Sequence, residues 1–199
     1  YPIAVINNGI DLESFKPAGS DFRKRYNITD KKIILGVAQV WGSRKGLRYF
    51  IELSSLLDDD FQIVLVGLTD KEKQLLPTNI IGLSRTNSIQ ELVEIYTAAD
   101  VFVNPTLEDN FPTTNLEALA CGTPVLTFDT GGSPEAIDET CGLVIKKGDI
   151  RMLQKGIKRI ISSDHDGKQC IRRAGLFDKN ERVGDYLSVY SSISVLGND

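Results

Sequence analysis

The sequence predicts an α/β protein built on a parallel sheet, and three observations support this fold class. Its 199 residues are enough for one hydrophobic core. Apolar residues make up 41% and charged residues 25%, which is usual for a soluble globular domain. Short apolar runs alternate with helical stripes about six times, as in parallel strands joined by crossover helices. We therefore expect a doubly wound, Rossmann-like sheet with helices on both faces.

The strands are expected where short apolar runs are bounded by polar or charged residues. Pro105 should stop the fourth run, because proline has no N–H group to donate to a neighbouring strand. The predicted strands are 31–39, 61–67, 79–83, 101–105, 123–128 and 142–148.

Helices are expected between these strands. The helix over 88–100 should open with a capping box formed by Ser88 and Glu91. The helix over 112–121 should end at Gly122, which suits the left-handed position that follows a helix. The remaining helical segments are expected at 45–57, in a short piece between 67 and 79, in a turn within 131–137, and as two or three helices over 149–195.

Charge and cysteine content narrow the class of protein. The net charge of −4 argues against a nucleic-acid partner. Cys121, Cys141 and Cys170 are odd in number and lack metal-ligand spacing, so we expect reduced thiols in a cytoplasmic protein, with a disulfide left open. We expect no membrane span and no signal peptide. Because the chain starts inside an apolar run without a methionine, we expect it to be part of a longer protein.

The loop over 36–46 follows the first predicted strand and carries two cations, Arg44 and Lys45, at the start of a helix. Cations are unfavourable at the positive end of a helix, so two of them indicate an anion that they help to hold. A pair of solvated surface cations is the alternative. The loop matches neither the P-loop nor the GxGxxG pattern, which disfavours a dinucleotide cofactor.

The segment before the helix over 112–121 has the chemistry of a phosphate and sugar site. Pro112 suits the first turn of a helix, and Thr113 and Thr114 then offer free N–H groups and hydroxyls to a phosphate. Asp109 precedes this helix start, and Glu117 lies about one turn inside, where a carboxylate can accept from two ribose hydroxyls. The alternative is that these acids favour the helix dipole and that Glu117 is a surface residue.

These motifs together resemble a known family. "DNFPTTNLE", from Asp109 to Glu117, resembles the acid-seven-residues-acid motif of retaining glycosyltransferases of the GT-B fold, in the large family four. "EALACGTPVLTFDTGGSPEAI" is similar to the segment that follows this motif in the family, "INNGIDLESF" to the start of its donor domain, and "SRKG" to its phosphate-binding Lys-Gly. The resemblance covers nearly the whole chain, from about Val5.

The resemblance implies a fold and a domain role. The family has two Rossmann-like domains with the active site between them, and residues 1–199 are similar to the C-terminal, nucleotide-sugar-binding one. We expect that the N-terminal acceptor domain is missing from this chain. We also expect a cytoplasmic location, with peripheral contact to the inner face of the membrane through that missing domain.

The resemblance also implies roles for residues. Lys45 would bind the diphosphate, Glu117 the ribose and Asp109 the transferred sugar. Two positions depart from the family. Asp109 stands where the family usually has Glu, and the neighbouring Glu108 is the alternative sugar-binding acid. Gln39 stands where the family often has Arg, and Arg44 would supply the missing positive charge. The other expected donor-binding residues are Leu83, Ser84 and Arg85 near the base, and Asn110, Phe111, Pro112, Thr113 and Thr114 near the sugar and phosphate.

The expected function is sugar transfer from a nucleoside-diphosphate sugar, UDP rather than GDP, in surface polysaccharide or glycolipid synthesis. No metal and no cofactor are expected, because cations can neutralise the leaving group. Two alternatives stay open: a nucleotide-sugar-binding module that is inactive alone, and a nucleotide-sugar epimerase of GT-B shape. A phosphorylase would need a pyridoxal-phosphate lysine, which no loop suggests.

Three further positions have two interpretations each. Trp41 can stack on a ligand or pack against its loop. Gly131 and Gly132 can line the site or form a tight turn. His165 is the single histidine and stands in a polar stretch, which favours a solvated residue over a catalytic base.

Overall fold

The structure is a computed structural model that describes residues 3–163 and 166–195. Its centre is a six-stranded, fully parallel sheet with the strand order β3-β2-β1-β4-β5-β6. This arrangement confirms the predicted α/β, Rossmann-like fold. The strands are β1 (Lys32–Val37), β2 (Phe61–Val66), β3 (Ile80–Leu83), β4 (Val101–Asn104), β5 (Val125–Phe128) and β6 (Gly142–Ile145).

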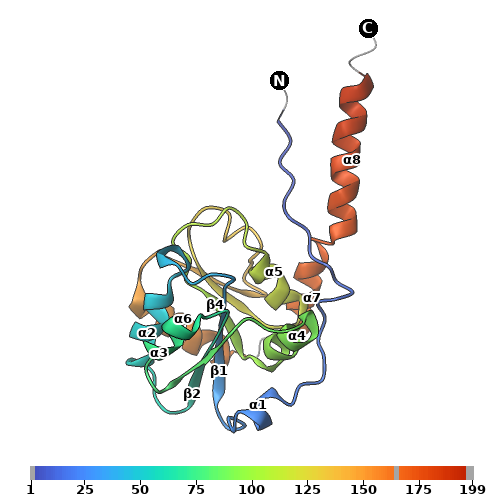
Figure 1. Cartoon of the computed structure of the whole chain (residues 1–199). Helices are drawn as coiled ribbons and strands as arrows, with labels where there is room; N and C mark the ends of the chain where they lie inside the picture. The colour runs from blue at the N-terminus through green and yellow to red at the C-terminus, as the bar shows by residue number, and fades with distance from the viewer. Residues whose placement is uncertain (1–2, 164–165, 196–199) are drawn as a thin grey trace.

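Helices cover both faces of the sheet, as Figure 1 shows. Strand side chains alternate between two hydrophobic clusters: Ile33 and Leu35 pack on the side of α4, α5 and α7, and Ile34 packs on the side of α2 and α6. The helices are α1 (Phe22–Arg25), the 3₁₀ turn η1 (Ser43–Lys45), α2 (Leu47–Ser54), α3 (Asp70–Gln74), α4 (Ile89–Ala98), α5 (Thr113–Ala120), α6 (Ile150–Ser162), α7 (Gly167–Gly175) and α8 (Lys179–Val195).

The start of α4 differs in detail from the expected capping box. The Ser88 hydroxyl does accept from the Glu91 N–H at 3.1 Å, but the Glu91 carboxylate accepts from the Asn87 N–H at 2.8 Å instead of from Ser88. A complete capping box forms at the start of α3, between Thr69 and Glu72. The box expected at α4 is therefore only half formed, because the Glu91 carboxylate reaches Asn87, one residue before the N-cap.

The ends of α5 set up the site described below. The helix begins at Thr113 with Pro112 as its N-cap, one residue later than expected. At the other end Gly122 has a φ of +82°, which glycine adopts without a Cβ penalty. Its N–H donates to the Leu119 carbonyl at 3.0 Å and the Thr123 N–H to the Ala118 carbonyl at 2.9 Å, the two bonds of a Schellman motif.

One other expectation is refined, and one short helix is new. Residues 131–136 form turns, and the helical turn expected within 131–137 is not assigned as a helix. The short helix α1 was not expected from the sequence. The three cysteines are free and buried, in agreement with the reduced thiols that the sequence indicates. In the described part of the chain, no helix combines the length and the hydropathy that crossing a membrane requires.

The N-terminal segment joins the C-terminal helices. The Ile10 N–H donates to the Phe177 carbonyl at 2.8 Å, and the Lys179 N–H donates to the Ile10 carbonyl at 3.0 Å. From this junction α8 and the first described residues both extend beyond the rest of the domain (Figure 1).

Candidate functional site

The loops that follow β1 and β4 meet at the carboxyl edge of the sheet, where ligands bind in folds of this type. Gly46 has a φ of +77°, and a Cβ there would lie 2.2 Å from the Pro105 carbonyl oxygen. The Leu107 N–H donates to the Arg44 carbonyl at 2.7 Å. The absence of a side chain at Gly46 therefore lets the loop with Lys45 pack directly on the loop that leads to Asp109.

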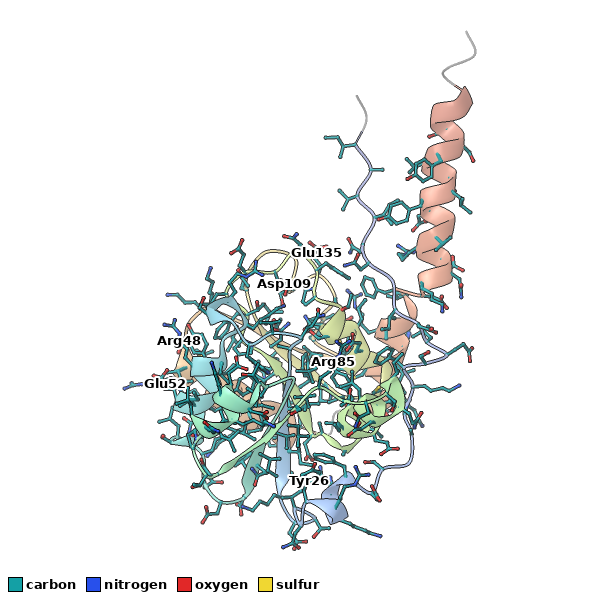
Figure 2. The ribbon with its side chains drawn as sticks, viewed as in Figure 1. Tyr26, Arg48, Glu52, Arg85, Asp109 and Glu135 are labelled. Carbon is teal, nitrogen blue, oxygen red and sulfur yellow. The ribbon has the colours of Figure 1, made fainter. Side chains whose placement is uncertain are left out.

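A second glycine contact fixes the loop of Asp109 from its other side. A Cβ on Gly132 would lie 1.6 Å from the Asn110 carbonyl oxygen, and the Gly132 N–H donates to the Asp109 carbonyl at 3.1 Å. Of the two interpretations of Gly131 and Gly132, the tight turn is confirmed, and this turn also holds the loop of Asp109 in place. Figure 2 shows Asp109 and Glu135 close to one end of the domain body, opposite to Tyr26.

Lys45 and Asp109 form an ion pair within this frame. The Lys45 Nζ lies 2.6 Å from the Asp109 Oδ2, and their side chains are 32% and 15% exposed. Glu108 is exposed instead, and its backbone carbonyl accepts from the Thr106 hydroxyl at 3.0 Å. Of the two acids that the sequence left open, Asp109 is the one beside Lys45.

The Lys45 cleft, of about 600 Å³, opens beside this ion pair. Asn8 also lines it, and its amide donates to the Phe111 carbonyl at 3.3 Å. A hollow of about 350 Å³ shares Lys45, Asp109 and Asn8 with this cleft and adds Glu108 and Asn110. The predicted residues that line the Lys45 cleft are Gln39, Arg44, Lys45, Asp109, Phe111, Pro112, Thr113 and Thr114.

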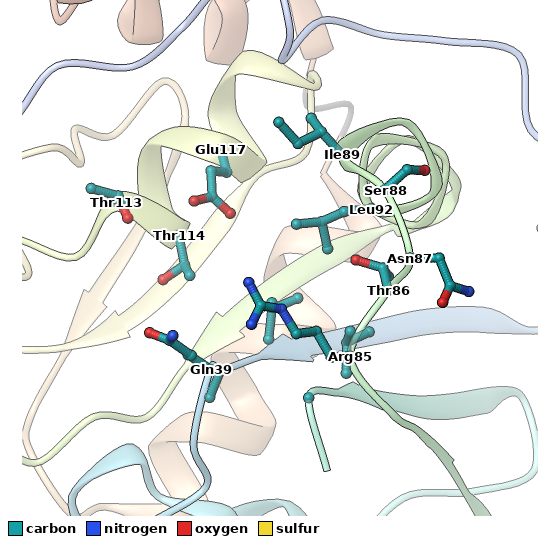
Figure 3. Close-up of a pocket in the computed structure, with 14 residues that line it drawn as sticks. Gln39, Arg85, Thr86, Asn87, Ser88, Ile89, Leu92, Thr113, Thr114 and Glu117 are labelled. Atoms are coloured by element: carbon teal, nitrogen blue, oxygen red, sulfur yellow. The ribbon is translucent and has the colours of Figure 1, made fainter.

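The Glu117 cleft, of about 640 Å³, adjoins the Lys45 cleft and shares Gln39, Thr113 and Thr114 with it. Figure 3 shows Glu117 and the two threonines on one wall, with the Arg85 side chain extending into the cleft from the other wall. The segment after Arg85, residues 86–88, completes that wall. The first turn of α5 therefore borders both clefts.

The beginning of α5 has the properties of an anion site. The N–H groups of Thr113 and Thr114 have no hydrogen-bond acceptor within the described part of the chain, whereas the Asn115 N–H already donates to the Pro112 carbonyl at 3.1 Å. Unpaired N–H groups and the helix dipole both favour a negative charge at this position. Because Lys45 and Arg44 line the same cleft, an anion there would meet these cations as well as the start of α5.

Glu117 is enclosed by protein on one side, so the interpretation of an ordinary surface residue is wrong. The hydroxyl of the fully buried Tyr96 donates to the Glu117 Oε2 at 2.9 Å. Burial raises the pKa of Glu117, and hydrogen bonds from the Tyr96 and Thr113 hydroxyls partly oppose this increase. Burial and the neighbouring carboxylate also raise the pKa of Tyr96 well above its usual value, so this hydroxyl stays protonated and donates.

Leu83 and Ser84, which were predicted to bind the donor, line neither the two clefts nor the adjoining hollow. The Leu83 carbonyl accepts from the N–H groups of Gly67 and Leu68, at 3.1 and 3.0 Å, and therefore supports the loop after β2. The Ser84 hydroxyl accepts from the Lys73 Nζ at 2.8 Å. Of the segment expected near a base, the structure brings Arg85 into the cleft.

Sequence reasoning missed several lining residues. Asn8, Thr86 and Asn87 line the clefts but have no chemistry that marks them in the sequence. Asn8 stands in "INNGID", a stretch for which the family resemblance implies no particular contact. Trp41 packs into the core, against β2 and α2: it is buried, its Nε1 donates to the Val66 carbonyl at 2.9 Å, and its ring meets Phe50 edge-on. His165 lies outside the described residues.

Comparison with known proteins identifies the family. The model of the glycosyl transferases group 1 family matches residues 20–176, and the chain belongs to this family. It is 28% identical, over 96% of its length, to N,N′-diacetylbacillosaminyl-diphospho-undecaprenol alpha-1,3-N-acetylgalactosaminyltransferase of Campylobacter jejuni, of which it covers 54%. It is 27% identical, over 95% of its length, to the putative glycosyltransferase EpsF of Bacillus subtilis, of which it covers 53%. The chain thus spans about half the length of these relatives.

Solved structures agree on the fold. The sucrose-phosphate synthase of Thermosynechococcus elongatus superposes with a TM-score of 0.82 at 24% identity, covering 96% of this chain and 52% of that one. Anabaena HepE in complex with UDP-glucose superposes with a TM-score of 0.81 at 18% identity. The match covers 95% of this chain and 57% of the HepE chain. These likenesses confirm the expected GT-B glycosyltransferase domain fold.

Proposed function

We propose that this chain is the donor-binding half of a retaining, metal-independent glycosyltransferase, which moves a sugar from a nucleoside-diphosphate sugar to an acceptor in surface polysaccharide or glycolipid synthesis. One observation carries the proposal. The Lys45–Asp109 pair, the free start of α5 and Glu117 follow one another along two adjoining clefts, in the order that a sugar, a diphosphate and a ribose require.

Each group has a role that suits its surroundings. Lys45, Arg44 and the N–H groups of Thr113 and Thr114 bind the diphosphate. Glu117 accepts hydrogen bonds from the ribose hydroxyls, and the wall formed by Arg85 and residues 86–88 lies beside the base. Asp109 accepts hydrogen bonds from hydroxyls of the transferred sugar. In the free protein, the Lys45 ammonium occupies this position beside the Asp109 carboxylate.

The chemistry follows from these charges. The bond between the anomeric carbon and the phosphate oxygen breaks, and its electron pair leaves with the nucleoside diphosphate. Lys45, Arg44 and the start of α5 stabilise that developing negative charge without reorganisation. The acceptor oxygen forms its bond on the face that the phosphate leaves, and its proton passes to the departing phosphate oxygen. Because protein cations neutralise the leaving group, adding Mg²⁺ or EDTA should leave donor binding nearly unchanged.

The proposal assigns acceptor binding to a second domain that this chain does not include. The relatives are about twice as long, so we assign the acceptor site and the closure of the cleft to a domain that precedes this one. The acceptor class is supported by the diphospho-undecaprenol substrate in the name of the Campylobacter relative. Contact with the inner face of the membrane, in the cytoplasm, would belong to that preceding domain.

A panel of UDP-, GDP-, ADP- and dTDP-sugars in a thermal-shift assay tests the donor class, since a ligand of the folded state raises the unfolding temperature. We expect UDP-sugars to give the largest shift, in line with the UDP-glucose complex of Anabaena HepE. A chain that none of these sugars stabilises would contradict the proposal.

The half-length chain itself favours a second function, a nucleotide-sugar-binding module that is inactive alone. We expect these 199 residues to bind a nucleoside diphosphate weakly and to transfer no sugar. Efficient transfer by them would overturn this assignment. Product analysis with the full-length protein then separates transfer to an acceptor from epimerisation of the donor.

A further inference from the structure

Tyr96, on α4, is a buried tyrosine whose position does not depend on its contact with Glu117. The residue is 0% exposed, and its ring packs edge-on against Phe102 at 5.6 Å between centroids. Its carbonyl accepts from the Thr123 hydroxyl at 2.7 Å. These contacts hold the ring in the core, and the hydroxyl at its end reaches the Oε2 of Glu117 at 2.9 Å.

Tyr96 does not line either cleft, so its hydroxyl meets a ligand only through Glu117. With Oε2 held by Tyr96 and one further hydrogen bond from the Thr113 hydroxyl, the remaining lone pairs of the carboxylate are left for a ligand in the cleft. We propose that Tyr96 is a positioning residue, whose hydroxyl keeps the Glu117 carboxylate ionised and turned toward the ribose hydroxyls of the bound nucleotide. This inference rests on the proposed role of Glu117.

The groups around Glu117 define how the contact responds to pH. Tyr96 faces it from α4, Thr113 shares α5 with it, Cys121 is the C-cap of that helix, and Arg85 lines the same cleft. The Cys121 thiol, with a pKa of about 12, is neutral near pH 7. Because the Tyr96 hydroxyl lowers the pKa of Glu117 against the effect of burial, its removal raises that pKa further. The carboxylate then protonates at a higher pH.

Tyr96→Phe removes the hydroxyl and keeps the ring. Titrations with UDP and 2′-deoxy-UDP, and with the matching guanosine pair, are made between pH 5.5 and 8. We expect Tyr96→Phe to weaken UDP binding about three- to tenfold at pH 7.5, with a smaller loss for the deoxyribose ligand. Relative to the unmutated protein, the loss should grow as pH falls. In a Glu117→Gln background the same change should cost no further affinity.

Tyr49→Phe is the matched control. Tyr49 is 4% exposed, lies in the hydrophobic cluster on the other face of the sheet, and its hydroxyl accepts from Arg48 at 2.8 Å. Its loss should leave nucleotide affinity within about twofold. Equal losses in the two phenylalanine variants would reduce Tyr96 to a packing residue and overturn the proposal.

A carboxyl NMR titration of Glu117 tests the same inference without a nucleotide. The midpoint should lie at a higher pH in Tyr96→Phe than in the unmutated protein. An unchanged midpoint, or an unchanged pH profile of UDP binding, would overturn the positioning role alone. A protein that binds none of these nucleotides would instead overturn the proposed function, so the two failures are distinguishable.

Discussion

At the scale of single residues, the ion pair between Lys45 and Asp109 gives the most direct test of phosphate binding. Lys45→Ala should weaken nucleoside-diphosphate binding by about 1.5–3 kcal/mol, because a charge-assisted hydrogen bond to phosphate is lost. Nucleoside binding should change little, since the nucleoside has no phosphate for Lys45. Calorimetric titrations with UDP and uridine measure both.

The matched control is Lys158→Ala. Lys158 also forms an ion pair, with Asp58 at 3.2 Å, but lines neither cleft. It should leave both affinities unchanged. Equal losses for UDP and uridine in Lys45→Ala would mean that Lys45 shapes the loop and does not contact phosphate.

Glu117 also gives a prediction for stability. Its pKa is raised in the folded state by burial, so the folded protein holds this proton more tightly than the unfolded chain does. The carboxylate therefore costs stability at pH values above its folded pKa, and the cost disappears below its unfolded pKa. Glu117→Gln should raise the unfolding temperature at pH 8, and the gain should vanish toward pH 4. Exposed Glu52→Gln, on α2, is the control; the same pH response in both variants would contradict the prediction.

At the scale of elements, the loops hold the site through glycine contacts. Gly132→Ala places a Cβ 1.6 Å from the Asn110 carbonyl oxygen, so the loop of Asp109 must move. We expect a loss of about 1–3 kcal/mol in the free energy of unfolding, with weaker nucleotide binding. Gly175→Ala in α7 is the control, because nothing lies within 4 Å of its Cβ. Denaturant titration and UDP binding measure both effects, and equal stabilities of the two variants would contradict the proposed contact.

The same elements show what sequence reasoning can and cannot predict. Continuous apolar runs such as Ile33–Leu35 mark buried parallel strands, because both faces of the sheet are covered, and all six expected strands form. The anion site at the start of α5 could be predicted, because Pro112, Thr113 and Thr114 are neighbours in the sequence. The hydrogen bond from Tyr96 to Glu117 joins residues 21 positions apart, and no local pattern reports it. The predicted contact of Leu83 with a base was wrong for the same reason. Its carbonyl accepts from N–H groups of the loop after β2, which is distant in the sequence.

At the scale of the whole molecule, the three buried thiols report on cooperative unfolding. Burial raises the pKa of Cys121 and Cys170 to about 12 and that of Cys141 to about 11. At pH 8 roughly one Cys141 thiol in a thousand is then ionised, and thiolate is the reactive form. Iodoacetamide should label the native chain much more slowly than the chain in denaturant. Fast native labelling of any of the three would show that its part of the core opens independently.

The start of α5 has a consequence for hydrogen exchange. The amides of Thr113 and Thr114 have no acceptor within the described part of the chain, and their deuterium uptake should be fast. The Gly132 amide is bonded to the Asp109 carbonyl and should exchange slowly whether or not a ligand is present. An anion seated on α5 would slow the two threonine amides and leave Gly132 unchanged. The protein thus contains its own reporter of occupancy, with an internal reference in the neighbouring loop.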